Sequence, residues 1–162
     1  MKKIFLMRHA KSSWKNSKLP DHERPLKKRG QKNAKSMGKF LKAKKHVPDI
    51  VLCSTAERAV QTANILTKAC GYDKEVIYTD KLYMAEPSNI FEILHDQPDK
   101  AKNIMIIGHN PGMEAFLQIL TGKVETLPTA SIAYLNLSIK KWANLNQKVE
   151  AKLKKLWRPK DL

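Results

Sequence analysis

Short apolar runs that end abruptly in polar residues are the clearest pattern along this chain. Three of them are followed closely by a histidine or an arginine: residues 4–7 by Arg8 and His9, residues 50–53 by Arg58, and residues 104–107 by His109. Such runs are typical of strands buried in a parallel sheet. The carboxyl ends of these strands meet at one edge, where open α/β sheets bind their ligands. We therefore expect both histidines and both arginines at one edge of one sheet.

Helical periodicity and turn residues fill the stretches between these runs. We predict strands over residues 2–8, 49–53, 75–78, 103–108, 131–137 and 151–157, helices over 29–45 and 89–96, a loop over 11–28, and a helical turn around Trp142. Ser54 and Glu57 have the spacing of a capping box, which predicts a helix that starts there and ends at Gly71. Another helix should start at Pro111, run to about residue 121 and close at Gly122. Strands that alternate with helices predict a three-layer α/β/α fold with a largely parallel sheet.

Length and composition indicate one domain. The chain has 162 residues, of which 42% are hydrophobic, enough for a packed core. No apolar run approaches the roughly 18 residues of a membrane span, and the N-terminal run is too short for a secretory signal, so we expect a cytoplasmic protein. Cys53 and Cys70 are predicted to be reduced thiols in or near the core. No cysteine–histidine cluster has the spacing of a zinc site, and we expect no metal and no cofactor.

The chain is strongly basic, with a formal net charge of +16 and lysines concentrated in residues 27–45 and 140–160. Such an excess attracts polyanions and acidic partners, although a solvated cationic surface would explain the same composition. The chain has no aromatic-rich strand of the RNA-binding type and no helix-turn-helix pattern, so nucleic acid is not favoured as a partner. The sequence does not indicate an oligomeric state.

Two imidazoles between two guanidinium groups suit an anion, and most simply a phosphoryl group. A neutral imidazole can attack phosphorus and form a reactive phosphoramidate, provided that a hydrogen bond holds its other ring nitrogen. Arg8 and Arg58 would bind the non-bridging oxygens, and His109 could donate to another. Each residue also has an ordinary explanation, such as a histidine satisfied within a turn or Arg58 paired on the surface with Glu57 or another carboxylate. A phosphoryl site explains all of them at once.

Five segments carry a more specific signal. They are residues 7–14 (MRHAKSSW), residues 21–26 (DHERPL) with Arg29 and Gly30, residues 54–62 (STAERAVQT), residues 108–112 (GHNPG) and residues 129–132 (TASI). In this order they resemble the histidine phosphatases, the two-histidine superfamily that includes phosphoglycerate mutases and acid phosphatases, and most of all the small SixA-type phosphohistidine phosphatases. Each segment is weak by itself, but the ordered set spans most of the chain. Ala10 departs from the glycine of the superfamily motif but keeps the position small.

The resemblance implies a phosphoglycerate mutase-like fold and a phosphatase with His9 as its nucleophile. The substrate would be phosphohistidine on a protein, and turnover would pass through a covalent phosphohistidine intermediate. The same resemblance implies that Arg8, Arg58 and His109 form the phosphate pocket and that Arg24 is an additional phosphate contact.

The general acid is less defined, with Asp21, Glu23 and Glu86 as candidates. The resemblance favours Asp21, which lies just before the Arg-Pro-Leu segment, although an aspartate there is equally explained as a capping residue of its loop. A leaving imidazole needs a proton less than an alkoxide does, so a weak acid would matter less for phosphohistidine.

Three other functions are compatible with parts of the sequence. A metal hydrolase would use His9, His22, His109, Asp21 and Glu23 as ligands, but the adjacent arginines would repel a divalent cation. A non-catalytic polyanion- or RNA-binding module explains the charge but not the paired histidines. A general phosphomonoesterase would keep the fold and act on small phosphate esters. Because residues 72–103 leave little chain for a lid, we expect an open, shallow site with a basic rim that accepts a phosphorylated protein.

Overall fold

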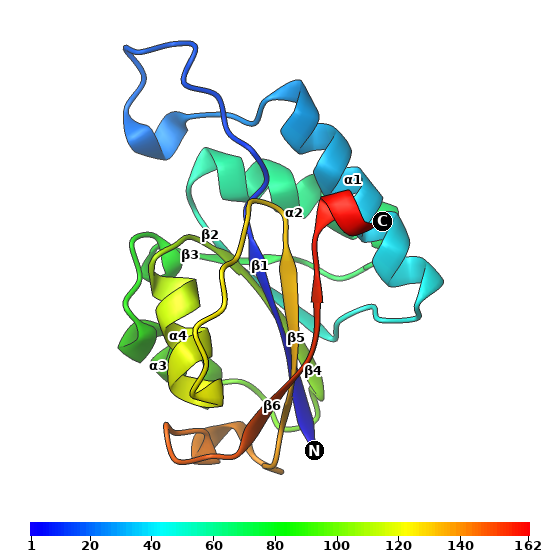
Figure 1. The fold of residues 1–162 in the computed structure, drawn as a ribbon, viewed down its shortest axis with the longest axis vertical. Coiled ribbons are helices and arrows are strands. Elements are labelled where there is room, and N and C mark those ends of the chain that lie inside the picture. Colours follow the sequence, from blue (N-terminus) through cyan, green and yellow to red (C-terminus); the bar gives the residue numbers. More distant parts are fainter.

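The computed structural model describes all 162 residues and has a six-stranded sheet with helices on both faces (Figure 1). The strands are β1 (Lys2–Arg8), β2 (Ile50–Ser54), β3 (Ile77–Thr79), β4 (Asn103–Gly108), β5 (Ile132–Leu137) and β6 (Ala151–Trp157). The helices are α1 (Lys28–Ala43), α2 (Glu57–Cys70), α3 (Pro87–His95) and α4 (Gly112–Thr121). Short 3-10 turns lie at Asp21–Glu23, Asp80–Leu82, Trp142–Asn144 and Pro159–Asp161. None of the helices combines the length and apolar character needed to cross a membrane.

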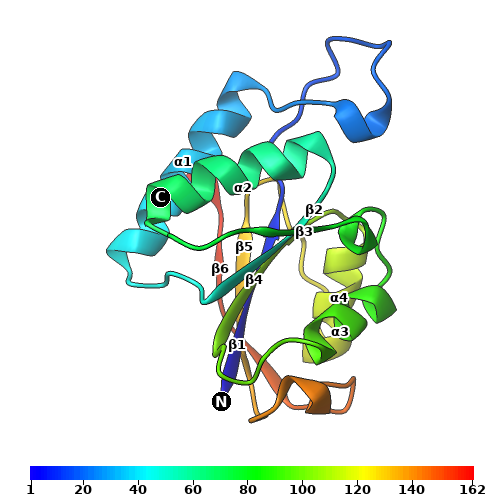
Figure 2. The same cartoon turned by 180° about the vertical axis from the view of Figure 1, so that it is seen from behind.

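The sheet has the order β3-β2-β4-β1-β5-β6. The four strands from β3 to β1 are parallel and β5 is antiparallel to both neighbours, so the predicted largely parallel sheet is confirmed. Strands β1 and β4 are adjacent, with Arg8 opposite Gly108. The chain leaves β1 toward α1 on one face and leaves β4 toward α4 on the other, as Figure 2 shows. The carboxyl ends of β1 and β4 therefore flank the kind of topological switch point at which α/β sheets bind ligands.

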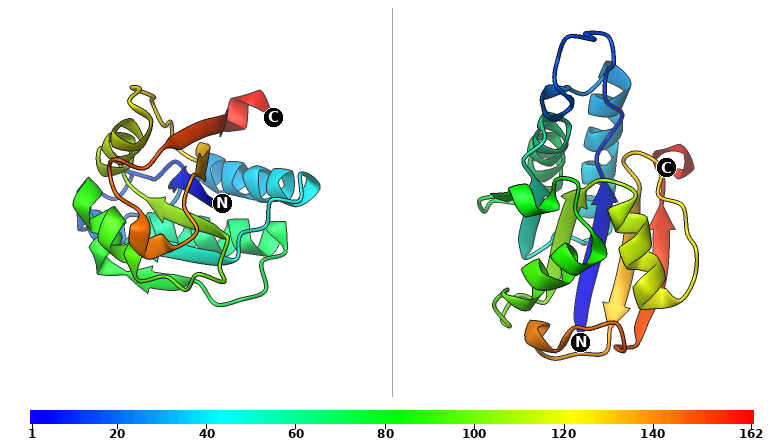
Figure 3. Two further views of the ribbon diagram at one scale, coloured as in Figure 1. Left: turned by 90° about the horizontal axis from the view of Figure 1, so that it is seen from below. Right: turned by 90° about the vertical axis from the view of Figure 1, so that its left-hand side faces the viewer.

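Each face of the sheet is covered by its own hydrophobic core. In β1, Ile4 and Leu6 face the core under α3 and α4, whereas Phe5 and Met7 face the core under α1 and α2 (Figure 3). Burial on both faces explains why the central strands read as continuous apolar runs and do not alternate. The two cysteines are free and buried, as predicted.

The predicted capping box at the start of α2 is wrong. Ser54 is the last residue of β2, and α2 begins at Glu57 with Ala56 as its N-cap. The Ser54 hydroxyl accepts a hydrogen bond from the Ala56 N–H at 3.2 Å, while the Glu57 carboxylate accepts one from Gln61 at 3.0 Å. Residue spacing alone did not reveal that the strand continues through Ser54 and leaves its hydroxyl at the sheet edge.

Other predicted elements are confirmed to within about two residues at each end, the usual uncertainty of element boundaries. The short strand β3 starts at Ile77, two positions later than predicted. The predicted loop over residues 11–28 contains a 3-10 turn at Asp21–Glu23, and α1 already starts at Lys28. This turn matters because it carries Asp21 to the edge of the sheet where β1 and β4 end.

Candidate active site

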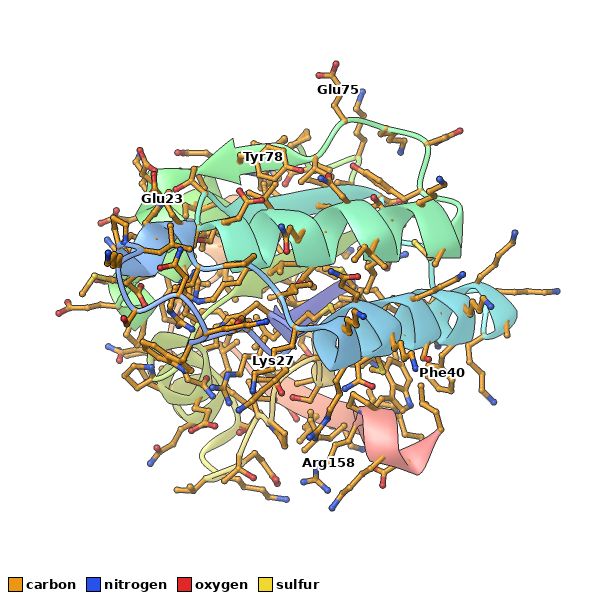
Figure 4. All side chains as sticks on the ribbon, turned by 90° about the horizontal axis from the view of Figure 1, so that it is seen from above. Glu23, Lys27, Phe40, Glu75, Tyr78 and Arg158 are labelled. Carbon is orange, nitrogen blue, oxygen red and sulfur yellow. The ribbon has the colours of Figure 1, made fainter.

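The structure brings both histidines and three arginines together at the carboxyl edge of the sheet. The His9 N–H donates to the Gly108 carbonyl oxygen at 3.1 Å, and the ring centroids of His9 and His109 lie 5.1 Å apart. A cavity of about 230 Å³ is lined here by Arg8, His9, Lys11, Ser12, Trp14, Arg24, Arg58, His109, Asn110 and Thr129. We call it the phosphate cavity. Figure 4 looks onto this edge of the molecule, with α1 and α2 side by side.

His9 is held as a neutral ring with one nitrogen free. Its Nδ1 lies 2.7 Å from the Ala10 carbonyl oxygen, which can only accept, so Nδ1 carries the proton and Nε2 keeps its lone pair. Burial is the main cause that lowers the pKa of His9 to about 4, and the charge of Arg58 adds to it. The Ala10 N–H donates to the Thr62 hydroxyl at 3.0 Å, so α2 fixes the peptide that orients the ring. This is the orienting hydrogen bond that nucleophilic attack requires.

His109 is oriented by Ser54. The His109 Nε2 lies 2.8 Å from the Ser54 hydroxyl, and burial lowers the pKa of His109 to about 3, with His9 as the next cause. Because the hydroxyl already accepts from the Ala56 N–H, its own proton is available to Nε2. The neutral ring then carries its proton on Nδ1, an atom that is buried and has no hydrogen-bond partner in the protein.

The guanidinium groups of Arg8 and Arg58 are hydrogen-bonded through their terminal nitrogens, whereas their Nε atoms have no partner. Arg8 donates through Nη1 to the Leu127 carbonyl oxygen at 3.1 Å, and Arg58 donates to the backbone and side chain of Asp21 at 2.8 and 3.0 Å. The Nε atoms of both arginines are buried without a partner, as is His109 Nδ1. Buried donors are rarely unsatisfied in native proteins. Three such donors, together with the unpartnered acceptor Asn110 Oδ1, belong to side chains that line one cavity, so the cavity offers several unused hydrogen-bonding groups to a polar ligand.

Arg24 enters the cavity from the segment before α1. It donates through Nη1 to the Ser12 hydroxyl at 2.7 Å and through Nε to the Asp21 carboxylate at 3.1 Å. The ring of Trp14 covers the guanidinium, with Cζ 3.5 Å from the ring centroid. Arg24 is buried and Trp14 is exposed, so the indole forms a rim above the cation.

Asp21 has the geometry of an anchor for arginines. Its carboxylate accepts hydrogen bonds from Tyr83, Arg58 and Arg24. The bond from Tyr83 is the largest cause that lowers the pKa of Asp21 to about 2, and the two arginines add to it. A group with this pKa is ionised at neutral pH and donates a proton poorly, so the structure does not favour the expected role of Asp21 as general acid.

The other two candidate acids differ in position. Glu23 is exposed and lines neither cavity at this edge; Figure 4 shows it on the outer side of its turn. Glu86 lies at the start of α3 and lines a larger cavity of about 440 Å³, which also has Asp21, Arg58 and His109 in its wall. We call it the leaving-group cavity, because it adjoins the phosphate cavity through Arg58, His109 and Asn110.

Several residues of the site were not identified from the sequence. Thr62 and Ser54 orient the two histidines, Tyr83 binds Asp21, and the Leu127 carbonyl oxygen holds Arg8. Thr62 lies one helical turn after Arg58 and donates to its carbonyl oxygen at 2.7 Å, a spacing that was visible in the sequence. Tyr83 and Leu127 come from distant segments and gave no sequence signal.

The residues that the alternative of a metal hydrolase would use as ligands do not gather. No group of three or more histidine, cysteine, aspartate or glutamate side chains lies close enough to hold a metal ion. His22 instead pairs through Nε2 with the Thr55 hydroxyl at 2.9 Å. Arg58 pairs with Asp21 and not with Glu57, so the alternative of a pair with another carboxylate is met, but the arginine itself is buried at the cavity and not on the surface.

The sequence matches proteins of one superfamily. Residues 4–83 match the family model of the histidine phosphatase superfamily, branch 1. An uncharacterised protein from Mycobacterium tuberculosis is 34% identical over 143 residues, which cover 82% of this chain and 87% of that protein. Phosphoglycerate mutase 1 from Saccharomyces cerevisiae is 40% identical over 67 residues, which cover 40% of this chain and 27% of the mutase.

Solved structures with the same architecture include several phosphatases. The protein histidine phosphatase SixA complexed with tungstate has a TM-score of 0.84 and 20% identity, covering 98% of both chains. A proposed phosphohistidine phosphatase SixA from Agrobacterium tumefaciens has a TM-score of 0.83 and 25% identity, again covering 98% of both chains. A mycobacterial glucosyl-3-phosphoglycerate phosphatase has a TM-score of 0.73 and 12% identity, covering 94% of this chain and 97% of its own. The fold is therefore phosphoglycerate mutase-like, as predicted.

Proposed function

Since this chain belongs to the histidine phosphatase superfamily, we propose that it hydrolyses phosphohistidine on a protein. The observation that carries the proposal is that three side chains with buried, unpartnered donors, Arg8, Arg58 and His109, line the same cavity as His9, whose Nε2 is free. These donors match the oxygens of a phosphoryl group, and the neutral ring supplies the nucleophile. The tungstate bound by a SixA protein of the same fold is an oxyanion of similar shape.

The first step transfers the phosphoryl group to His9. The lone pair of Nε2 attacks phosphorus, the P–Nε2 bond forms, and the P–N bond of the substrate breaks as its imidazole leaves. Arg8, Arg58 and His109 Nδ1 donate to the three non-bridging oxygens and stabilise their charge. The ring of His9 becomes positive, and the Ala10 carbonyl oxygen on Nδ1–H stabilises that charge.

The second step returns His9 to its neutral form. A water molecule attacks phosphorus from the side that the leaving imidazole has vacated, the P–Nε2 bond breaks, and inorganic phosphate departs. The vacated side is the leaving-group cavity, whose apolar lining includes Met84, Pro87 and Ala115. Its carboxylates, Glu86 and Asp21, can orient the attacking water. No step needs an acid from the protein when the substrate ring already carries a proton on its other nitrogen, because breaking the P–N bond then releases a neutral imidazole.

The charge of the site supports a mechanism without a metal ion. The cavity is lined by Arg8, Arg24, Arg58 and Lys11 and by no carboxylate, and Asp21 beside it is bound by two of these arginines. A divalent cation would be repelled here, and the arginines already supply the charge that it would bring. We therefore expect full activity in EDTA and inhibition by vanadate. Loss of activity in EDTA that zinc or magnesium restores would contradict this.

Side-by-side turnover tests the substrate. We expect kcat/KM for a phosphohistidine protein to exceed kcat/KM for sugar phosphates by at least about tenfold, because imidazole is a better leaving group than a sugar alkoxide. Para-nitrophenyl phosphate, whose phenolate also leaves easily, is the activated small ester in the comparison, and a protein-specific enzyme should turn it over less efficiently than the phosphohistidine protein. A preference for one sugar phosphate would assign a small-molecule phosphomonoesterase, with its substrate in the leaving-group cavity. Tight binding of phosphate or RNA with no turnover of any ester would assign a binding module.

The expected cytoplasmic location is part of this proposal. Its support is chemical: Cys53 and Cys70 are free, buried thiols, as expected of a protein in a reducing compartment. Fractionation of cells with an antibody against the chain would test it.

A further inference from the structure

A second polar cavity lies beside the phosphate cavity. Its volume is about 380 Å³, and its lining consists of Arg29, Asn33, Pro128, Thr129, Arg158, Pro159 and Lys160. Thr129 also lines the phosphate cavity, so the two are neighbours with one residue in common. We call it the flanking cavity. The proposed reaction does not use it.

The walls of the flanking cavity are held by packed aromatic rings. The ring of Trp157 stacks on Tyr134 of β5 at a centroid distance of 5.5 Å and meets the edge of Phe40 in α1 at 5.2 Å. These contacts fix the C-terminal turn against α1, and Figure 4 shows Arg158 and Phe40 on this side of the molecule. Arg158 and Lys160 therefore line the same cavity as Arg29, and Arg158 directly follows the packed Trp157.

The segment that carries Thr129, the residue common to both cavities, is hydrogen-bonded to the backbone of the strand end that carries His9. The Ala130 N–H, next to Thr129, donates to the carbonyl oxygens of Arg8 and His9 at 3.0 Å each. Ala130 has a φ of 62°, in the left-handed region, so this turn has a specific shape that the hydrogen bonds maintain. A substrate whose phosphoryl group reaches His9 is consequently one short segment away from the flanking cavity.

The charge of the flanking cavity is uncompensated. Arg29, Arg158 and Lys160 are three cations, and no carboxylate lines the cavity with them. Both ion pairs of the structure belong to Asp21, so none of the three forms one. Cations gathered around a polar space repel each other, and an oxyanion between them relieves that repulsion and accepts their hydrogen bonds.

We propose that the flanking cavity is a second oxyanion subsite. It binds a carboxylate or a second phosphate carried by the same substrate whose phosphoryl group His9 attacks. If the substrate is a phosphohistidine protein, the carboxylate belongs to an acidic residue near the phosphohistidine. In that case the inference rests on the proposed function. The cationic and polar lining, with no hydrophobic side chain other than prolines, does not suit an apolar substrate group.

Two substrate pairs separate the sources of the anion. The first is a phosphohistidine peptide with aspartates around the phosphorylated residue and its counterpart with serines. The second is an aryl phosphate with another phosphate on a flexible linker and its singly phosphorylated counterpart. The test variant is the double substitution Arg29→Gln and Arg158→Gln. The control is the double substitution Lys35→Gln and Lys154→Gln, which removes the same charge from exposed positions of α1 and β6 outside both cavities.

We expect the test variant to lower kcat/KM about tenfold for the doubly anionic member of at least one pair, mainly through KM. Its kcat/KM for the singly anionic members should stay within about twofold, as should every value for the control. Loss on the acidic peptide assigns a carboxylate, and loss on the linked bisphosphate assigns a second phosphate. Equal losses in test and control variants would show general attraction at long range and overturn the subsite, as would an unchanged preference in the test variant.

The bisphosphate pair keeps this inference apart from the proposed function. An enzyme that ignores phosphohistidine peptides but prefers the linked bisphosphate, and loses that preference in the test variant, would disprove the protein substrate and retain the subsite. If wild type and test variant both turn over the two peptides at equal rates, the protein substrate is supported and the subsite is disproved.

Discussion

Strand β1 carries a buried cation at its amino end and another cation at its carboxyl end, and the two are satisfied in opposite ways. Lys2 is 4% exposed, its ammonium donates to the carbonyl oxygens of Asp99 and Ala101, and it lies over the ring of Trp142. Arg8, six residues later, donates to one carbonyl oxygen, and its buried Nε has no partner. The charge of Lys2 is used within the fold, whereas that of Arg8 is available to a ligand.

The comparison teaches how to separate structural from functional charge in one molecule. A buried cation with backbone acceptors stabilises the native state, because removing it leaves carbonyl groups unsatisfied. A buried donor without an acceptor costs stability until a ligand arrives, and such residues cluster at functional sites. Substitutions at the two ends of β1 should therefore separate into changes of stability and changes of activity.

The largest expected effect is on the carboxyl side of the comparison. His9→Ala should lower kcat by about 10⁴-fold or more, because it removes the nucleophile, while the midpoint of thermal unfolding stays near that of the wild type. Acid-labile phosphate trapped during turnover should be found on His9 and be absent from the variant. His95→Ala, a substitution in α3, should retain both label and activity. Label on another residue of the His9→Ala protein would disprove the assignment.

Lowering the pH should destabilise the protein through the two buried histidines at the carboxyl edge of the sheet. Unfolded histidines bind a proton near pH 6.5, whereas the pKa values of folded His9 and His109 are about 4 and about 3. The unfolded state therefore takes up protons first, and stability is lost as the pH falls from 6.5 toward 4. His9→Gln should reduce that loss at pH 4 by about 3 kcal/mol.

Urea unfolding at a series of pH values measures this loss. Asp21, with a pKa of about 2, affects stability only as the pH falls below about 4, and it does so with the same sign, because its ionised form is favoured in the folded state. Its half-exposed side chain keeps that contribution small. Equal slopes for wild type and His9→Gln between pH 6.5 and 4 would show that His9 is not buried as a neutral ring.

At the amino end, Lys2→Met should act on stability alone. The substitution leaves the Asp99 carbonyl oxygen without its buried donor and should cost about 1–3 kcal/mol of unfolding free energy. The Ala101 carbonyl oxygen keeps its hydrogen bond from Trp142 Nε1 at 2.8 Å, which limits the damage. At a temperature where both proteins are folded, kcat/KM should stay within about twofold of the wild type. A loss of activity without a loss of stability would remove the contrast between the two ends.

The smallest expected effect decides the role of Asp21. As an anchor for Arg58 and Arg24, Asp21→Asn should lower kcat/KM by a similar factor, about tenfold, for phosphohistidine and for alkyl phosphates. As a general acid it would slow the alkyl phosphates far more, because only the poorer leaving group needs the proton. Glu86→Gln is the comparison variant, and a loss confined to alkyl esters would assign the acid to Glu86. A loss confined to alkyl esters in Asp21→Asn would restore the role first expected for it.

The sequence predicted the fold and four of the central side chains because these depend on short-range pattern. The apolar runs before Arg8, Arg58 and His109 reflect strands buried on both faces. Such a run can be identified in the sequence without knowing which strands it pairs with. The placement of a helix start is less local. Ser54 has the right spacing for a cap, yet β2 continues through it and its hydroxyl binds His109 instead.

By itself, then, the sequence determined the largely parallel α/β architecture, the strand-end position of His9 and His109, and the excess of positive charge. Only the tertiary structure decided which charges are free. Asp21 became an arginine anchor through Tyr83, which lies in a distant segment, and Arg29 came to line the same cavity as Arg158 through the packing of Trp157 on α1. The physical reason is that hydrogen-bond partners and burial are set by contacts between segments far apart in the chain. A linear pattern records which groups are present but not which of them remain unpaired.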